Sequence, residues 1–171
     1  MKGLTTSFGQ PTNAVYGFIN MLNKILKEKK PTHLGVCFDV SRDTFRARRF
    51  AEYKINRPPM PEGLSSQMPL IKQVIAAYGI ASFEKAGFEA DDVIATLARK
   101  ARQEDYDVVI ISSDKDILQL VDERIRVFSP HKDEGVLYTS EKVAERFEVP
   151  AQKVTDLIAL MGDDVDNIPG I

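Results

Sequence analysis

Residues 107–116 read DVVIISSDKD, and this stretch decides the fold class. The apolar run Val108–Ile111 is short and continuous, which is typical of a strand buried on both faces of a parallel sheet. Asp114 and Asp116 follow this run directly, at the start of a short helix predicted over residues 115–120. Ligands of parallel α/β sheets bind beyond the carboxyl ends of the strands, so we expect the chemistry at this point.

The elements predicted on both sides of this stretch continue the alternation of strands and helices. Five segments have apolar residues at helical spacing or helix-capping residues, namely 12–29, 61–78, 90–102, 140–147 and 151–161. Four short apolar runs are predicted strands, namely 33–38, 80–83, 126–128 and 136–138. We therefore predict an α/β fold with a largely parallel central sheet flanked by helices.

The composition is that of a globular domain and excludes several classes of protein. The chain has 171 residues, of which 43% are hydrophobic and 28% charged. A single cysteine cannot form an internal disulfide, which excludes the secreted disulfide scaffolds. No apolar run approaches the ~18 residues of a membrane helix, and the first residues lack a signal-peptide core. We expect one domain over residues 1–171, without a membrane partner and in the cytoplasm.

The net charge of −2 conceals an uneven distribution of charge along the chain. Residues 1–60 carry 11 Lys and Arg against 4 Asp and Glu, whereas residues 61–171 carry 12 against 21. A basic region can bind phosphates and an acidic region can hold metal ions. Chance variation between the two parts of a chain would give the same totals, so the distribution alone leaves both interpretations open.

Acidic residues gather at four places, three of them on predicted connections between strands and helices. Converging carboxylates repel one another unless a cation lies between them, and Mg²⁺ prefers such oxygen ligands. Two metal ions sharing them can stabilise the attacking and leaving oxygens of a phosphodiester. Helix caps, helix-dipole partners or solvated turns would give each group an ordinary structural role. The groups are Asp39; Glu89, Asp91 and Asp92; Asp114 and Asp116; and Asp163, Asp164 and Asp166.

Basic and aromatic residues alternate between residues 42 and 57. Guanidinium and ammonium groups pair with phosphates, and aromatic rings stack on unpaired bases. A solvated basic helix with its rings in the core would have the same pattern. The basic residues are Arg42, Arg46, Arg48, Arg49, Lys54 and Arg57, and the aromatic ones are Phe45, Phe50 and Tyr53.

A series of ordered segments carries a resemblance that extends over about residues 4–171. The most specific are GFEADDVI at 87–94 and SDKDILQL at 113–120. The others are GQPTNAVYGF at 9–18, PTH at 31–33, FD at 38–39, TFR at 44–46, YK at 53–54, NRPPMP at 56–61, LMGD at 160–163 and DNIPG at 166–170. Together they resemble the 5′ nuclease domain at the amino end of bacterial DNA polymerase I, within the flap-endonuclease superfamily.

This resemblance implies a PIN-like or resolvase-like fold and a metal-dependent phosphodiester hydrolase. It implies 5′→3′ exonuclease and 5′-flap endonuclease activity in DNA replication and repair, on DNA with 5′ flaps, nicks or branches. It also implies two Mg²⁺ ions, which Mn²⁺ can replace. The implied metal-site carboxylates are Asp39, Glu89, Asp91, Asp92, Asp114, Asp116, Asp163 and Asp166.

The resemblance also implies a set of residues that bind DNA. Lys54 and Arg57 would contact the scissile phosphate and serve catalysis, and Tyr53 would stack on the terminal base. Arg46 would help to bind phosphates. The implied DNA-binding residues are Arg42, Phe45, Arg46, Tyr53, Lys54 and Arg57.

The chain departs from the family pattern at both of its ends. The family begins with a strand that ends in Asp-Gly and supplies a central metal ligand, and no such segment precedes Leu4. Beyond the position of Ile171 the family continues into a helix–turn–helix that binds the downstream duplex, with a polymerase portion in the parent protein. We therefore expect an incomplete 5′ nuclease domain, truncated at both ends, with weak or absent catalysis.

Two other interpretations remain open from the sequence. The chain could be a catalytically dead module that binds branched DNA through residues 42–57. Alternatively, Asp114 and Asp116 could be the metal pair of a nucleotide-sugar transferase, an interpretation that gives no role to residues 42–57.

Overall fold

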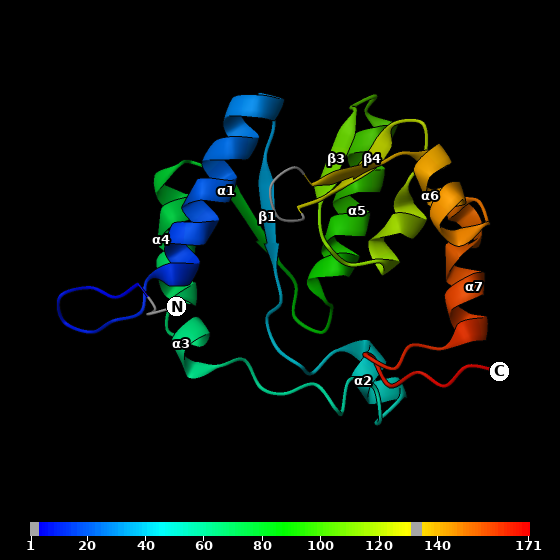
Figure 1. The fold of residues 1–171 in the computed structure, drawn as a ribbon, viewed down its shortest axis with the longest axis horizontal. Helices are drawn as coiled ribbons and strands as arrows, with labels where there is room; N and C mark the ends of the chain where they lie inside the picture. Colours follow the sequence, from blue (N-terminus) through cyan, green and yellow to red (C-terminus); the bar gives the residue numbers. More distant parts are fainter. Residues whose placement is uncertain (1–3, 131–134) are drawn as a thin grey trace. The chain divides into compact units, whose positions relative to one another are not determined.

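The computed structural model describes residues 4–130 and 135–171, which belong to two units (Figure 1). Unit 1 comprises Met1–Phe38 and Pro58–Phe83, and unit 2 comprises Asp39–Arg57 and Glu84–Ile171. The expectation that residues 1–171 form one catalytic domain stays a prediction.

Unit 1 is built on two helices that lie side by side, α1 (Asn13–Lys29) and α4 (Met68–Ala77). Ile71 and Ile75 of α4 form a buried core with Phe38. The remaining elements are α3 (Glu62–Ser65), β1 (Gly35–Phe38) and β2 (Ala81–Glu84), with the two strands paired in a two-stranded sheet.

The helix predicted over residues 61–78 is interrupted in the structure, which has α3 and α4 in its place. Pro69 lies in the first turn of α4, where its missing N–H has no intrahelical acceptor to lose. Gln67, just before this turn, is buried, and its Oε1 accepts from the backbone N–H groups of Ala14 and Val15 at 2.8 and 3.2 Å. The interruption thus supplies a partner for the free N–H groups at the start of α1.

Unit 2 contains a three-stranded sheet in the order β3-β4-β5. Strands β3 (Val108–Ile111) and β4 (Ile125–Ser129) are parallel, with Val108 opposite Ile125, and β5 (Val136–Tyr138) is antiparallel to β4. The helical elements of this unit are α2 (Phe45–Arg49), α5 (Ala90–Gln103), η1 (Asp116–Leu120, 3₁₀), α6 (Ser140–Phe147), η2 (Ala151–Lys153, 3₁₀) and α7 (Val154–Met161).

The core of unit 2 fixes the carboxyl end of β3. Ile110 of β3 is buried with Ile117 and Leu118 of η1, and Val127 of β4 is fully enclosed. A buried residue of this kind contributes about 1.5–3 kcal/mol relative to an exposed one. The residues between β3 and η1 are therefore held between two parts of one apolar cluster.

The predicted α/β class with parallel strand pairing is confirmed, but the strands do not form one sheet. In the described part of the chain, β1 and β2 form one sheet and β3, β4 and β5 another. The basic and aromatic stretch at 42–57 contains the short helix α2, whose N-cap Thr44 accepts from the Ala47 N–H. Within residues 4–130 and 135–171, no helix is long and apolar enough to cross a membrane.

Candidate functional site

Two acidic side chains lie at the carboxyl end of β3, as the sequence predicted. The turn is held by a hydrogen bond from the Asp114 N–H to Ser112 Oγ at 3.1 Å and by another from the Asp116 N–H to Asp114 Oδ1 at 2.9 Å. Asp116 Oδ1 is buried and has no hydrogen-bond partner among the described residues. Burial and the nearby charge of Asp114 raise the pKa of Asp116. This oxygen lacks the positive partner that a buried carboxylate needs.

A second acidic group lies at the start of α5. Glu89 is the N-cap of this helix and forms a capping box with Asp92, and the Ala90 N–H donates to Asp39 Oδ1 at 2.7 Å. Asp91 is half-buried, and burial, reinforced by the charge of Asp114, raises its pKa to about 6. The raised pKa is typical of a partly buried carboxylate that lies near other carboxylates.

The third group lies on a tight turn near the end of the described chain. Asp163 and Ile168 exchange two backbone hydrogen bonds, and Asp163 Oδ1 accepts from the N–H groups of Val165 and Asp166. Gly162 precedes the turn with φ +77°, and a Cβ there would lie 2.7 Å from the Ile168 carbonyl oxygen. Asp163 and Asp166 are both buried by this geometry.

The basic segment, residues 42–57, is anchored to the Asp163–Asp166 turn through its backbone. The Lys54 N–H donates to the Asp166 carbonyl oxygen at 2.9 Å, and Asn167 Nδ2 donates to the Glu52 carbonyl oxygen at 3.0 Å. Lys54 itself has φ +56°, a conformation that this anchoring must hold in place. The cations of residues 53–57 are therefore positioned by the same turn that positions two of the acids.

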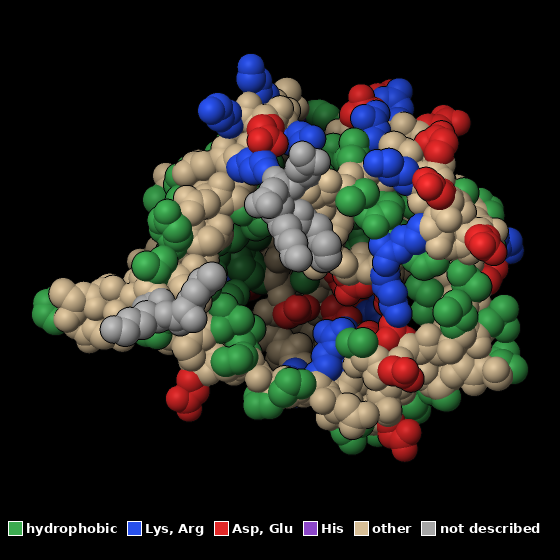
Figure 2. Space-filling view, viewed as in Figure 1, with side chains coloured by type: hydrophobic (Ala, Val, Ile, Leu, Met, Phe, Trp, Pro, Cys, Tyr) green, Lys and Arg blue, Asp and Glu red, His purple; other side chains and the backbone are tan. Residues whose placement is uncertain are grey.

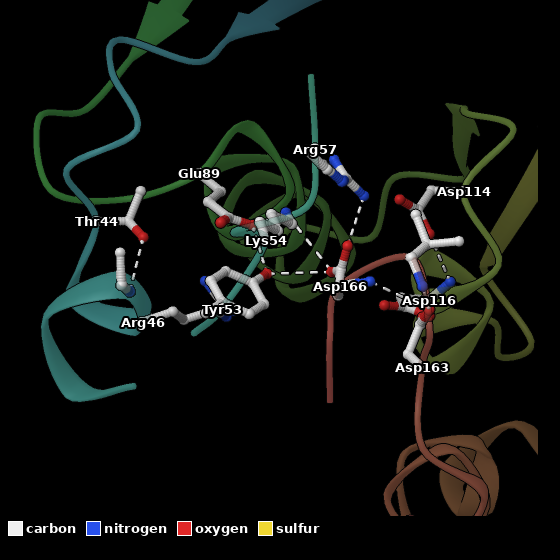
Figure 3. Close-up of polar contacts among 12 residues, drawn as sticks. Thr44, Arg46, Tyr53, Lys54, Arg57, Glu89, Asp114, Asp116, Asp163 and Asp166 are labelled. Carbon is white, nitrogen blue, oxygen red and sulfur yellow. Dashed lines mark hydrogen bonds and ion pairs between the residues drawn. The ribbon is translucent and has the colours of Figure 1, made fainter. Parts of the chain in front are cut away.

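Three side chains of the segment bind the carboxylates directly (Figure 3). Lys54 Nζ lies 2.8 Å from Glu89 Oε2, and the Arg57 guanidinium donates to Asp166 Oδ1 at 2.6 Å. The Tyr53 hydroxyl lies 3.2 Å from Glu89 Oε2 and 3.3 Å from Asp166 Oδ2, and burial raises its pKa to about 12. Burial opposes the charge of Lys54, but the hydrogen bond to Glu89 prevails and its pKa is raised.

Lys54, Arg57, Glu89 and Asp166 line a cavity of about 580 Å³ in unit 2. On the face shown in Figure 2, acidic and basic side chains lie next to one another. Within the described residues, no three acidic, histidine or cysteine side chains are gathered closely enough to hold a metal ion as they stand. The acidic residues of the lining are Asp39, Glu89, Asp91, Asp114, Asp116, Asp163 and Asp166, and the basic ones are Lys54, Arg57, Lys115 and Arg146.

Asp92 is the one expected metal-site residue outside this lining. Both of its oxygens bind the Arg46 guanidinium, at 2.6 and 2.8 Å, and its backbone N–H and carboxylate complete the capping box of α5. The hydrogen bonds from Arg46 lower the pKa of Asp92 although burial opposes them. This geometry gives Asp92 and Arg46 a structural partner in each other.

The other expected DNA-binding residues lie beside the cavity. The Phe45 ring lies 5.6 Å from the Phe88 ring, and the Arg46 guanidinium is 4.6 Å from the Phe45 ring centre. Arg42 donates to the Arg57 carbonyl oxygen at 3.3 Å. Neither Arg42 nor Phe45 contributes to the cavity lining, so any role in DNA binding would be outside it.

Two basic residues of the lining were not predicted from the sequence. Lys115 forms an ion pair with Asp163 at 3.0 Å and, despite its burial, Asp163 has a lowered pKa because of this bond and those from its turn. The position of Lys115 between Asp114 and Asp116 in the sequence could have indicated that it belongs to the site. Arg146 lies on α6, and no motif or residue spacing in that part of the sequence indicated a place in the site.

A family model described as "5'-3' exonuclease, N-terminal resolvase-like domain" matches residues 1–148. A 5'-3' exonuclease of Aquifex aeolicus is 48% identical over 168 residues, covering 98% of this chain and 57% of that protein. A DNA polymerase I of Mycobacterium leprae is 47% identical over 172 residues, covering 99% of this chain and 19% of that protein. The chain thus spans from about a fifth to somewhat over half of these relatives.

A solved structure has a similar fold. The flap endonuclease of bacteriophage T5, described as a pseudo-enzyme-product complex with DNA and metal ions, superposes with a TM-score of 0.75. Its sequence is 24% identical, and the match covers 91% of this chain and 61% of that one. At this level of identity the likeness shows the fold alone, which agrees with the family match.

Proposed function

The chain belongs to the 5'-3' exonuclease family through its N-terminal resolvase-like domain, and from this membership we propose that it hydrolyses DNA phosphodiesters with the help of divalent metal ions. One observation carries the proposal, which is that seven carboxylates and the cations Lys54 and Arg57 line one cavity. Carboxylates attract metal ions and the cations attract phosphate. The proposed substrates are nicked or branched DNA and DNA with 5′ flaps, met in replication and repair.

The carboxylates of the cavity fit a hard divalent cation. Their donor atoms are all oxygens, Asp116 Oδ1 is buried without a partner among the described residues, and Asp91 has a raised pKa, so additional positive charge would be favourable here. We propose that Glu89, Asp91, Asp114, Asp116, Asp163 and Asp166 contribute to holding two Mg²⁺ ions, which Mn²⁺ can replace. Asp39 lines the same cavity and completes the proposed set.

When bound, divalent ions supply the activation of a water molecule and charge stabilisation on the phosphate that it attacks. The side chains of Lys54 and Arg57 bind the non-bridging oxygens of that phosphate, which lowers the cost of the negative charge that builds up on it. Lys54 and Arg57 bind the carboxylates of Glu89 and Asp166 in the structure. When a phosphate binds, its oxygens would replace these carboxylate oxygens as partners of the two cations. The Tyr53 ring, next to Lys54, offers a surface on which a terminal base can stack.

The proposal is tested by incubating the chain with a labelled 5′-flap duplex in the presence of Mg²⁺ or Mn²⁺. We expect weak cleavage that requires the metal and that falls by at least about a hundredfold in Asp114→Asn. Asp107→Asn is the matched control, because Asp107 is exposed, lies 3.9 Å from Arg126 and does not line the cavity. The control should cleave at the unchanged rate.

The outcome separates the proposal from the binding alternative. Salt-sensitive binding of the flap duplex without metal-dependent turnover would support a catalytically dead module and contradict the proposed hydrolysis. Cleavage that persists in Asp114→Asn would also contradict it, because the activity would then not depend on the cavity.

A further inference from the structure

Four basic residues line the acidic cavity, and three of them are already paired with its carboxylates. Lys54 binds Glu89, Arg57 binds Asp166 and Lys115 binds Asp163, with closest N–O distances of 2.8, 2.6 and 3.0 Å. The fourth, Arg146, has no ion pair with a carboxylate in the described part of the chain. Its charge is therefore available to an anion that enters the cavity.

Arg146 is held in place by neutral groups. Its Nη1 donates to the Tyr138 hydroxyl at 2.6 Å, and its guanidinium carbon lies 5.4 Å from the Tyr138 ring centre and 5.2 Å from that of Phe147. Tyr138 belongs to β5 and pairs with Val127 of β4, so the hydroxyl is fixed by the sheet. Cation–π contacts orient a guanidinium without neutralising it.

Only one of the five N–H groups of this guanidinium is used by Tyr138. The other donors can form the paired hydrogen bonds with which arginine binds phosphate. The residue comes from α6, far along the chain from the basic segment 42–57. The cavity lining thus contains a cation that comes from a second, independent element.

We propose that Arg146 binds a backbone phosphate of the DNA strand that occupies the cavity, next to the phosphate held by Lys54 and Arg57. This inference rests on the proposed function, since it takes DNA as the occupant. It adds a binding residue, whose contact is made in the ground state and in the transition state alike. Loss of the contact should therefore raise KM and leave kcat nearly unchanged.

The test compares Arg146→Gln with the unsubstituted chain in two measurements. Fluorescence anisotropy with a labelled 5′-flap duplex, in a chelator so that no cleavage occurs, gives Kd at several salt concentrations. We expect Kd to rise about tenfold at 0.1 M salt. The slope of log Kd against log salt concentration should become smaller by about one, because one phosphate contact is lost. In Mg²⁺, KM should rise by about the same factor while kcat changes less than about twofold.

Two further variants serve as controls. Arg124→Gln removes an arginine that pairs with Asp105 and does not line the cavity, and it should leave Kd and the salt slope unchanged. Arg146→Lys keeps the charge and loses the paired donors, so it should keep the salt slope and bind less tightly than the unsubstituted chain. Thermal unfolding would show whether Arg146→Gln fails to fold. In that case the affinity of Arg146→Lys still tests the role of the guanidinium.

The results distinguish this inference from the proposed function. An Arg146→Gln chain with unchanged Kd, slope and KM, but a lower melting temperature, would overturn the inference and leave Arg146 as a link between α6 and β5. If the unsubstituted chain neither binds the duplex in a salt-sensitive way nor cleaves it, the proposed function fails and the inference fails with it. Cleavage by the unsubstituted chain together with an unaffected Arg146→Gln overturns the inference alone.

Discussion

The Arg57 guanidinium binds Asp166 at 2.6 Å, and the Asp166 side chain is only 11% exposed. Lys54 Nζ lies 3.7 Å from the other oxygen of the same carboxylate. Cations of the basic segment thus partly neutralise an acid that belongs to the proposed metal site. A metal ion would compete with Lys54 and Arg57 for the oxygens of this carboxylate. Removing one of these cations should therefore affect metal binding and phosphate binding in different ways, which can be measured.

Replacement of Lys54 by methionine should impair cleavage without weakening metal binding. Lys54 stands 2.8 Å from Glu89, so its loss removes a competitor for that carboxylate, while the phosphate loses a charge-stabilising donor. We expect kcat to fall by about 10²–10³ and the metal Kd, measured by calorimetry, to stay equal or become tighter. Lys153→Met is the control, because Lys153 pairs with Asp156 on an exposed surface. A parallel loss of metal affinity would contradict this assignment.

Asp91→Asn should stabilise the metal-free chain at pH 7 but not at pH 4.5. Burial raises the pKa of Asp91 to about 6 in the folded state, against about 3.9 in an unfolded chain. The folded state therefore binds this proton more tightly, and the cost of the buried charge, present above about pH 6, is relieved as the pH falls toward 4. Urea unfolding in a chelator should show a gain of about 1 kcal/mol at pH 7, a figure reduced for partial exposure. An equal effect at both pH values would refute it.

Asp92 and Asp116 should respond differently to the same substitution. Asp92→Asn breaks the paired hydrogen bonds to Arg46 and should lower the free energy of unfolding by about 1–2 kcal/mol while metal binding persists. Asp116→Asn should weaken metal binding by about tenfold or more, because its buried Oδ1, which has no hydrogen-bond partner in the described part of the chain, is a proposed ligand atom. Calorimetric metal titration and urea unfolding of both variants check this. Loss of metal binding in Asp92→Asn would restore Asp92 to the metal set that the resemblance implied.

Local sequence patterns predicted the elements of the fold well, because they depend on spacing within short segments. The run Val108–Ile111 forms the expected strand, and residues 90–102 form a helix that ends one residue later, at Gln103. The break between α3 and α4 was missed, since the pattern of apolar residues continues across it. The separation of the strands into two sheets was also missed, because pairing between strands depends on contacts that no local pattern records.

The site was predicted as a set of residues, but not as a set of partners. Seven of the eight acids share a cavity because strand ends and helix starts bring them together in such a fold. The engagement of Asp92 by Arg46 depends on how α2 lies against the start of α5, where the Phe45 N–H donates to the Gly87 carbonyl oxygen. Arg146 was missed because its neighbours on α6 carry no motif. The Asp92–Arg46 contact and the position of Arg146 at the cavity depend on tertiary structure, so local patterns in one sequence could not predict them.

The turn that carries Asp163 and Asp166 should depend on glycine at position 162. With φ +77° and backbone atoms of Ile168 and Gly170 in the place of a Cβ, Gly162→Ala should cost about 1–3 kcal/mol of unfolding free energy. It should also weaken metal binding, since both acids would shift. Gly17→Ala is the control, because Gly17 lies in α1 with open space around its Cβ position, and it should stabilise the chain by about 0.5–1 kcal/mol. Urea unfolding and metal titration of both variants check this, and a Gly162→Ala chain with unchanged stability and metal affinity would show that the turn adapts and does not fix the two carboxylates.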